Sequence, residues 1–366
     1  MSTPTSPPSS DSPDPTGDPA GHGDAARSPA PSWKRLGIVG GAIVGAVALV
    51  AGIVAVGGAG GDAPAPAASA GSPVIEDHSA NTVVDTEWLA ANLDDPDVAV
   101  IEVSTEPGLY ERGHIPGATN YVWTTDFVST VNRDVVSRED FTELTRRTGI
   151  DPDTTVVLYG DRDNWFAAWG AWVFTLYGHE NVTVLDGGRG AWEAEGRPLS
   201  VDAPAAGQGT WEAAEADPDL RAFLPEVIEI ARAAESGGTT GTDLVDIRGA
   251  AEFSGEIFAP EGFQETAVRA GHIPGAVNVA WAEAVDEDGR FKPVDELREI
   301  YAAQGVDGSR PVVVYCRIGE RASHTWFVLS QILGYDVKLY DGSWTEYGNT
   351  VGVPVVNEAG TVWGVA

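Results

Sequence analysis

The only cysteine in the chain, Cys316, lies in a turn that contains arginines and a glycine and follows the strand-like run Val312–Tyr315. In such a turn, backbone N–H groups, with those of the first turn of a following helix, can point at the sulfur. Arg317 and Arg321 add positive charge, and Gly319 allows backbone conformations that are closed to other residues. Because these surroundings favour an anion, the pattern predicts a thiol that ionises readily and acts as a nucleophile.

The backbone N–H groups of Ile318 and Glu320 are the predicted donors to that anion, and Gly319 is predicted among the residues that bind the substrate. The alternative is that Cys316 is an inert thiol, since free cysteines are often buried. A single cysteine excludes an intrachain disulfide. The six histidines show no metal-ligand spacing, so the sequence predicts neither a metal site nor a cofactor.

Three arginines are candidates for binding an anionic substrate: Arg317, Arg321 and Arg248. A guanidinium suits oxyanions because its planar fork donates two hydrogen bonds at once. Each arginine also has a structural alternative. Arg317 could be a solvated loop residue, and Arg321 could pair with Glu320 or another acid. Arg248 could form a buried pair with Asp246, Glu252 or another acid.

The chain is strongly acidic, with a net charge of −33 over 366 residues. Such a field does not attract nucleic acid or anionic lipid, so we expect no nucleic-acid partner. It also repels a small anion, so local positive charge must prevail within about one Debye length, some 8 Å at physiological salt. The length predicts two domains with additional chain.

The N-terminal part of the chain differs in composition from the rest. Residues 1–35 are rich in Pro, Ser, Gly and Asp and are predicted to be disordered. The uncharged apolar run 36–59 is long enough to cross a bilayer as a helix of about 1.5 Å rise per residue. The alternative is a cleaved signal peptide with a small-residue site at 68–70. Residues 60–79 are expected to form a flexible tether.

Two basic residues, Lys34 and Arg35, directly precede the apolar run. The positive-inside rule then predicts a single-pass protein of the cell membrane with its larger part outside the cytoplasm. Gly37, Gly41 and Gly45 recur at every fourth position, which would permit close helix pairing and a homodimer.

Four motifs occur twice in the same order. "VAVIEVS" (98–104) returns as "TDLVDIR" (242–248), and "ERGHIPGATNYVW" (111–123) returns as "RAGHIPGAVNVAW" (269–281). "TTVVLYG" (154–160) returns as "RPVVVYC" (310–316), and "VTVLDGGRGAWEAEG" (182–196) returns as "VKLYDGSWTEYG" (337–348). The repeat predicts two homologous domains, 80–200 and 239–358, joined by a connector, 201–238, and followed by a tail, 359–366.

Within each repeat, short β-branched runs alternate with stretches of helical period. Val312–Tyr315 suits a strand buried on both faces, and Val337–Leu339 is the next predicted strand. Between them, Trp326, Leu329 and Leu333 recur at helical spacing. Strand, helix and strand with short connections predict a parallel sheet flanked by helices, with ligands at the carboxyl ends of the strands.

The repeated "GHIPGA", the segment "YDGSWTEY" and the loop "CRIGERASHTW" together resemble motifs of the tandem-rhodanese sulfurtransferases, which are thiosulfate and 3-mercaptopyruvate sulfurtransferases. The loop is most similar to that of actinobacterial thiosulfate sulfurtransferases. The resemblance covers the chain from about residue 80 and implies two tandem rhodanese-like α/β domains. It also implies that "LVDIR" (244–248) is the strand that brings Arg248 to the substrate.

The chemistry that the resemblance implies is a two-step sulfur transfer. Cys316 would take a sulfane sulfur from a small anionic donor and become a persulfide, and a thiol or cyanide would then remove that sulfur. In this family the N-terminal domain has usually lost its cysteine and is structural. Gly160, which aligns with Cys316 in the repeat, fits that pattern.

Two positions depart from the family pattern. Ile318 stands where well-studied thiosulfate enzymes carry a lysine, and Glu252 stands where many members carry a second substrate arginine. Mercaptopyruvate enzymes usually have small residues after the cysteine, which Arg317 and Ile318 do not match. We therefore favour thiosulfate as the donor, with 3-mercaptopyruvate as the alternative.

Two other functions use the same cysteine. A phosphatase of the rhodanese-like type needs five residues between its cysteine and its arginine, which would put the arginine at position 322, whereas Arg321 comes one residue earlier. The second alternative is a carrier or binding module that accepts a persulfide from a partner protein and passes it on without turnover of small substrates.

Overall fold

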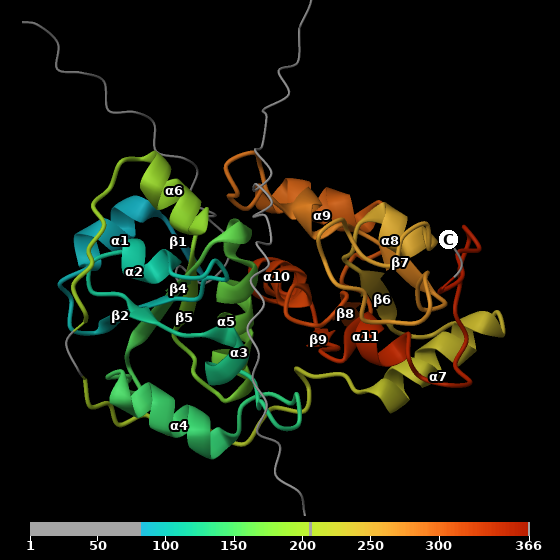
Figure 1. Ribbon diagram of the computed structural model, residues 1–366, viewed down its shortest axis with the longest axis horizontal. Helices are drawn as coiled ribbons and strands as arrows, with labels where there is room; N and C mark the ends of the chain where they lie inside the picture. Colours follow the sequence, from blue (N-terminus) through green and yellow to red (C-terminus); the bar gives the residue numbers. More distant parts are fainter. Residues whose placement is uncertain (1–81, 205–206, 365–366) are drawn as a thin grey trace, which may run out of the picture. The chain divides into compact units, whose positions relative to one another are not determined.

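The computed structural model describes residues 82–204 and 207–364 (Figure 1). The predicted disordered segment, membrane span and tether, together 1–79, lie outside these residues. Within 82–204 and 207–364, no helix combines the length and apolar character needed to cross a membrane.

The N-terminal half contains a five-stranded sheet in which every paired neighbour is parallel. Its order is β1 (Val83–Val84), β5 (Val182–Leu185), β4 (Thr155–Tyr159), β2 (Val98–Glu102) and β3 (Thr119–Asn120). Its helices are α1 (Thr86–Asn92), α2 (Leu109–Arg112), α3 (Trp123–Asp126), α4 (Arg138–Arg147), α5 (Trp165–Leu176) and α6 (Gly188–Ala194). Alternate residues of β4 enter different core clusters, so the central strand is buried on both faces.

The C-terminal half repeats this plan with a four-stranded parallel sheet (Figure 1). Its order is β7 (Ala276–Asn278), β6 (Asp243–Asp246), β8 (Val312–Tyr315) and β9 (Val337–Leu339). Its helices include α8 (Ala250–Ser254), α9 (Val294–Ala302), α10 (Ala322–Trp326) and α11 (Ser343–Tyr347). The order β2–β4–β5 in the first sheet corresponds to β6–β8–β9 in the second, so the repeat in the sequence is a repeat of the fold.

The predicted strands Val312–Tyr315 and Val337–Leu339 are confirmed as β8 and β9. The predicted helix between them is also present. It begins as α10 and continues with π-helical geometry over Phe327–Ile332, and it buries the side chains of Trp326, Leu329 and Leu333. It ends before Gly334, which has a φ of 74°, because this backbone conformation is readily adopted by glycine.

The predicted connector contains helix α7 (Leu224–Glu235). Val227, Ile230 and Ala231 of this helix join the core cluster that contains Val313 and Tyr315 of β8. The connector helix therefore packs on the C-terminal half. Pro225 lies in the first turn of α7, where the N–H that a proline lacks would have no hydrogen-bond partner within the helix.

The two halves pack against each other through α5 and α10. One core cluster includes residues of both sheets, among them Leu158 of β4 and Val314 of β8. Trp165 at the start of α5 meets Trp281 edge to face, with ring centroids 4.7 Å apart. Helix α5 follows Gly160, and helix α10 follows Cys316. Because these two helices contact each other, the carboxyl ends of β4 and β8 approach the same region.

Candidate active site

Cys316 follows β8 directly and is fully buried. Its Sγ accepts a hydrogen bond from the backbone N–H of Gly319 at 3.1 Å. The backbone of Cys316 is held on its other side by the start of α11: its N–H donates to Ser343 Oγ at 3.1 Å, and its carbonyl accepts from the N–H of Trp344 at 3.1 Å. The predicted placement of the thiol at the carboxyl end of a buried parallel strand is confirmed.

Gly319 is the loop residue whose N–H reaches the sulfur, and its backbone requires a glycine. Its φ is 111°, which side-chain-bearing residues rarely adopt. A Cβ at this position would lie 2.2 Å from the carbonyl oxygen of Asp341. The two predicted backbone donors, Ile318 and Glu320, do not bond the sulfur in this structure; the N–H of Gly319 between them does. The N–H that binds the sulfur therefore belongs to a position that a residue with a side chain could not occupy without strain.

A cavity of about 250 Å³ opens beside the loop. Side chains of both halves line it: Thr105, Trp123, Arg162, Trp165 and Phe166 from the first half, and Pro260, Phe263, Arg317, Ile318 and Arg321 from the second. Three of the ten are arginines, whereas none is acidic. Despite the acidity of the whole chain, this cavity is therefore suited to an anion.

Arg317 and Arg321, both predicted as anion ligands, are among the lining residues, and each is oriented by an aromatic ring. The Arg317 guanidinium lies 5.3 Å from the centre of the Phe263 ring and donates to the carbonyl of Gln264 at 2.5 Å. Burial lowers the pKa of Arg317, and the like charge of Arg321 lowers it further.

Arg321 lies 5.3 Å from the centre of the Trp165 ring, which belongs to the other half. Its guanidinium is 3.8 Å from a carboxylate oxygen of Glu252. The pairing of Arg321 with an acid is therefore observed, but with Glu252 rather than with Glu320. Both arginines keep further N–H groups for a ligand, because a guanidinium carries five.

Arg248 is not among the residues that line the cavity. Its side chain is 1% exposed and forks the carboxylate of Asp246, with nitrogen–oxygen distances from 2.6 to 3.1 Å. It also donates to the carbonyl of Gly271 at 2.7 Å and lies 4.8 Å from the centre of the Trp344 ring. The geometry favours the structural alternative stated above, a buried ion pair that ties β6 to the loop before β7.

Glu320 is a buried carboxyl in the loop that follows Cys316. Burial raises its pKa to about 7, while Arg133 and Arg317 lower it and Asp341 raises it further. The loop around the cysteine therefore combines a thiol whose sulfur accepts a backbone N–H with a carboxyl group that is largely protonated in mildly acidic solution.

The residues that sequence reasoning missed come from the N-terminal half. Arg162 lies in the loop after β4, which corresponds to the cysteine loop of the second half, and Trp165 begins α5 directly after that loop. Arg162 has a φ of 50°, and its Nε donates to Thr105 Oγ1 at 2.8 Å. The signal was present in the segment "GDRDNW", since residues after the carboxyl end of a parallel strand commonly meet ligands.

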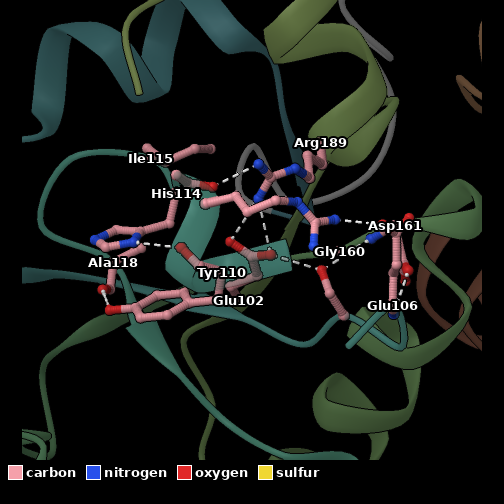
Figure 2. Close-up of polar contacts among 12 residues, drawn as sticks. Glu102, Glu106, Tyr110, His114, Ile115, Ala118, Gly160, Asp161 and Arg189 are labelled. Atoms are coloured by element: carbon pink, nitrogen blue, oxygen red, sulfur yellow. Dashed lines mark hydrogen bonds and ion pairs between the residues drawn. The ribbon is translucent and has the colours of Figure 1, made fainter. Parts of the chain in front are cut away.

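In the first half, Gly160 takes the position of Cys316, and Figure 2 shows it beside Asp161. The Asp161 carboxylate accepts hydrogen bonds from the N–H groups of Thr105 and Glu106, both at 2.9 Å. The Asn164 amide accepts from Gly160 N–H at 3.0 Å and donates to the carbonyl of Leu185 at 2.7 Å. A Cβ at Gly160 would lie 2.3 Å from the carbonyl oxygen of Val103.

The first half also contains a counterpart of the Asp246–Arg248 pair (Figure 2). Arg189 of α6 donates to both carboxylate oxygens of Glu102, at 2.9 and 3.1 Å, and to the carbonyl of Gly113. Gly113 and Gly271 are equivalent residues of the repeated "GHIPGA" motif. Both halves therefore place a buried guanidinium between a strand-end carboxylate and this glycine carbonyl.

Comparisons with known proteins agree with the repeat. The family model described as "Rhodanese-like domain" matches residues 85–195 and 229–350. The "Sulfur carrier protein TtuD" of Thermus thermophilus is 49% identical over 276 residues, which cover 75% of this chain and 95% of that protein. A protein of Mycolicibacterium smegmatis named "Putative thiosulfate sulfurtransferase" is 47% identical over 278 residues, covering 75% of this chain and 97% of its own.

A solved structure shows the same similarity. The crystal structure of SseA from Escherichia coli, which is described among the 3-mercaptopyruvate sulfotransferases, matches with a TM-score of 0.60 and 29% sequence identity. The match covers 72% of this chain and 98% of SseA.

Proposed function

Because the chain belongs to the rhodanese family and contains two rhodanese-like domains, we propose that it transfers a sulfane sulfur from thiosulfate to a thiol or cyanide through a persulfide on Cys316. The observation that supports this most directly is the 3.1 Å hydrogen bond from Gly319 N–H to Cys316 Sγ, in a loop whose arginines line a cavity. A sulfur that accepts a backbone N–H is stabilised in its anionic form.

In the proposed first step, the Cys316 thiolate attacks the outer sulfur of thiosulfate. A new sulfur–sulfur bond forms, the bond within thiosulfate breaks, and sulfite leaves with the electron pair. The terminal sulfur of the persulfide then carries the negative charge. Backbone N–H donors and guanidinium groups around the loop would stabilise this charge and that of the departing sulfite.

In the second step, an acceptor nucleophile attacks the terminal sulfur of the persulfide. Cyanide would leave as thiocyanate, and a thiolate would leave as a persulfide of its own. In both cases the electron pair of the broken bond returns to the Cys316 thiolate. The cycle needs neither an external oxidant nor a reductant, and it involves no cofactor.

The three cavity arginines, Arg162, Arg317 and Arg321, are the proposed ligands of the donor. A thiosulfate dianion has three oxygens that accept hydrogen bonds, which suits several guanidinium forks better than a single carboxylate substrate would. Ile318 adds an apolar wall where a mercaptopyruvate enzyme of the pattern described above would have a small residue. This is why thiosulfate is preferred over 3-mercaptopyruvate.

Two alternatives have specific support. Similarity to SseA favours 3-mercaptopyruvate as the donor. Similarity to the Thermus protein named as a sulfur carrier favours a module that passes sulfur between proteins. The carrier hypothesis and the enzyme hypothesis differ in turnover: a carrier would be loaded once by a small donor but would not release thiocyanate repeatedly.

The experiment that tests the proposal follows both steps on the purified full-length chain. Intact mass after thiosulfate treatment is expected to increase by one sulfur on Cys316, and thiocyanate is expected to accumulate over many turnovers after cyanide is added. Cys316→Ser should abolish both signals. Equal thiocyanate formation by the Ser variant would refute the proposal, and sulfur loading without turnover would favour the carrier. Parallel assays with 3-mercaptopyruvate decide the donor.

The proposed location is the cell membrane, with the catalytic domains outside the cytoplasm. The support is the uncharged apolar run 36–59 preceded by Lys34 and Arg35. In untreated cells the protein should then be recovered with the membrane fraction, and protease added to intact cells should digest its rhodanese-like domains. Recovery of the protein in the cytoplasmic fraction would contradict this.

A further inference from the structure

The loop 316–321, which contains Cys316, is contacted by a segment of the first half that does not line the cavity. This segment, residues 127–136, folds back on itself: Val136 N–H donates to Phe127 carbonyl at 2.9 Å, and Ser129 N–H donates to Asp134 carbonyl at 2.7 Å. Phe127 and Val136 are buried in the core. The segment is therefore fixed at its base, and its tip presents two neighbouring charged residues, Arg133 and Asp134.

The first of these residues reaches the cysteine loop directly. The Arg133 guanidinium donates to the carbonyl of Ile318 at 2.5 Å. Ile318 is the residue immediately before Gly319, so its carbonyl belongs to the same peptide unit as the N–H that points at Cys316 Sγ. Fixing one end of a planar peptide group fixes the other, since the group does not rotate about its C–N bond. Arg133 thus orients the donor of the sulfur from the opposite end of the peptide.

The second residue acts through Arg221 of the connector. One nitrogen of the Arg221 guanidinium lies 2.7 Å from a carboxylate oxygen of Asp134 and 2.7 Å from one of Asp341. Its Nε lies 3.1 Å from the other oxygen of Asp341. The backbone at Arg221 is itself anchored, because Leu339 N–H donates to the Leu220 carbonyl at 3.0 Å and Ala222 N–H donates to the Leu339 carbonyl at 3.0 Å.

Asp341 is the point where this second chain of contacts meets the loop. Its carbonyl oxygen lies so close to Gly319 that a Cβ there would be only 2.2 Å away. A shift of Asp341 would therefore move the wall against which Gly319 rests. Arg133 holds the peptide before Gly319, and the Asp134–Arg221–Asp341 chain holds the backbone packed against it.

We infer that Arg133, Asp134 and Arg221 are positioning residues for sulfur transfer, which hold the Ile318–Gly319 peptide so that its N–H stays directed at the sulfur of Cys316. The inference rests on the proposed function for its catalytic consequence, but the geometry that it describes does not depend on the sulfur donor. It also gives the first half, which has no cysteine, a direct part in the chemistry of the second half.

The test compares Arg133→Ala and Arg221→Ala with wild type in the full-length chain. Two properties are measured: the rate of Cys316 alkylation by iodoacetamide as a function of pH, followed by intact mass, and kcat and KM for thiosulfate. We expect alkylation at neutral pH and kcat each to fall about tenfold, because a hydrogen bond to an anion weakens, with KM changed less than about threefold. Arg133→Lys should recover most of both, since it retains a cationic donor.

The matched control is Arg146→Ala, which removes a partly exposed arginine from the first half, one that pairs with Glu212 away from the loop. It should leave both measurements at wild-type values. Wild-type alkylation and kcat in Arg133→Ala would overturn the inference, and so would an equal loss in Arg146→Ala or a failure of Arg133→Lys to recover. If Arg221→Ala does not fold, the variants of the exposed Arg133 decide the question alone.

The two proposals fail separately. If wild-type protein shows no sulfur transfer, the proposed function fails, and the alkylation profiles still decide the positioning role because they need no donor. If wild type turns over but Arg133→Ala alkylates and turns over as wild type does, only the positioning role fails.

Discussion

The two halves of the molecule share a strand order but use different side chains at equivalent points. In the first half, the guanidinium between the strand-end carboxylate and the "GHIPGA" glycine comes from Arg189 of α6, whereas in the second it comes from Arg248, beside β6. The N–H after the central strand is bound by the Asn164 amide in one half and by Ser343 Oγ in the other. The fold therefore preserves the interaction rather than the residue that makes it.

The difference that matters for chemistry is what occupies the loop after the central strand. In the second half, a backbone N–H points at a sulfur, and two arginines of the same loop line the adjacent cavity. In the first half, Asp161 accepts the nearby N–H groups of the chain, so an internal carboxylate already occupies the donors. The first half contributes walls and contacts to the shared cavity, and the second contributes the nucleophile.

The strongest test of this division moves the cysteine. Cys316→Ser should abolish sulfur transfer, and adding Gly160→Cys to it should restore none. The reason is that a Cβ at Gly160 meets the Val103 carbonyl at 2.3 Å, and the Asn164 amide already fills the turn in which a sulfur would have to lie. Thiocyanate production by the double variant, measured at matched folded concentration, would show that the two loops are interchangeable.

The buried ion pairs provide a second comparison. Asp246→Asn should lower the free energy of unfolding by about 3–5 kcal/mol, because it removes the carboxylate that the buried Arg248 guanidinium forks. Glu102→Gln should cost less, because Arg189 keeps its ion pair with the half-exposed Glu193. Urea denaturation measures both. Glu212→Gln, which loses an exposed partner of Arg146, should cost less than about 1 kcal/mol. If only one of the variants Asp246→Asn and Glu102→Gln lowered the free energy of unfolding as little as Glu212→Gln does, the two buried pairs would not be equivalent.

Glu320 offers a test by pH, since its counterpart four residues after Gly160 is the uncharged Asn164. Its pKa in the folded protein, about 7, is higher than its ordinary 4.5. The carboxyl therefore contributes stability below pH 4.5, and this contribution is lost as the pH rises to about 7. Relative to Glu320→Gln, wild type should lose about 3 kcal/mol over this range. Parallel stability curves for the two proteins would contradict the assignment.

The smallest expected effect concerns the arginine that the first half adds to the cavity. Arg162→Ala should raise KM for thiosulfate by about tenfold, equivalent to about 1.4 kcal/mol, and leave kcat within about twofold. Arg317→Ala, in the cysteine loop itself, should affect both constants. Steady-state kinetics at constant ionic strength separates the cases. An unchanged KM in Arg162→Ala would confine donor binding to the second half.

The sequence predicted the parts of the site that lie close together in the chain. Cys316, Gly319 and the two loop arginines follow one strand, so local turn chemistry was enough to identify them. Arg162 and Trp165 were missed because their role depends on how the two sheets pack, which local patterns do not encode. The fold class could be predicted from the repeated motifs and the apolar strand runs, because both can be read directly from the sequence.

Arg248 shows where a local rule could have improved the prediction. It lies two residues after Asp246, and residues two apart on an extended strand face the same side. An adjacent carboxylate on the same face, with little room for water, favours an ion pair over an open substrate site. The Arg248 side chain is buried against the Trp344 ring and the Gly271 carbonyl, and these residues lie far from Arg248 in the sequence.

The crowding at Gly160 also has an evolutionary consequence. Recovery of a second nucleophile there would require several coordinated changes, among them displacement of the Asn164 amide, which itself would contact any side chain at Gly188. A thiol added at Gly160 alone would not reach the place that Cys316 occupies in the other half, so a nucleophile at this point of the fold is confined to one of the two repeats.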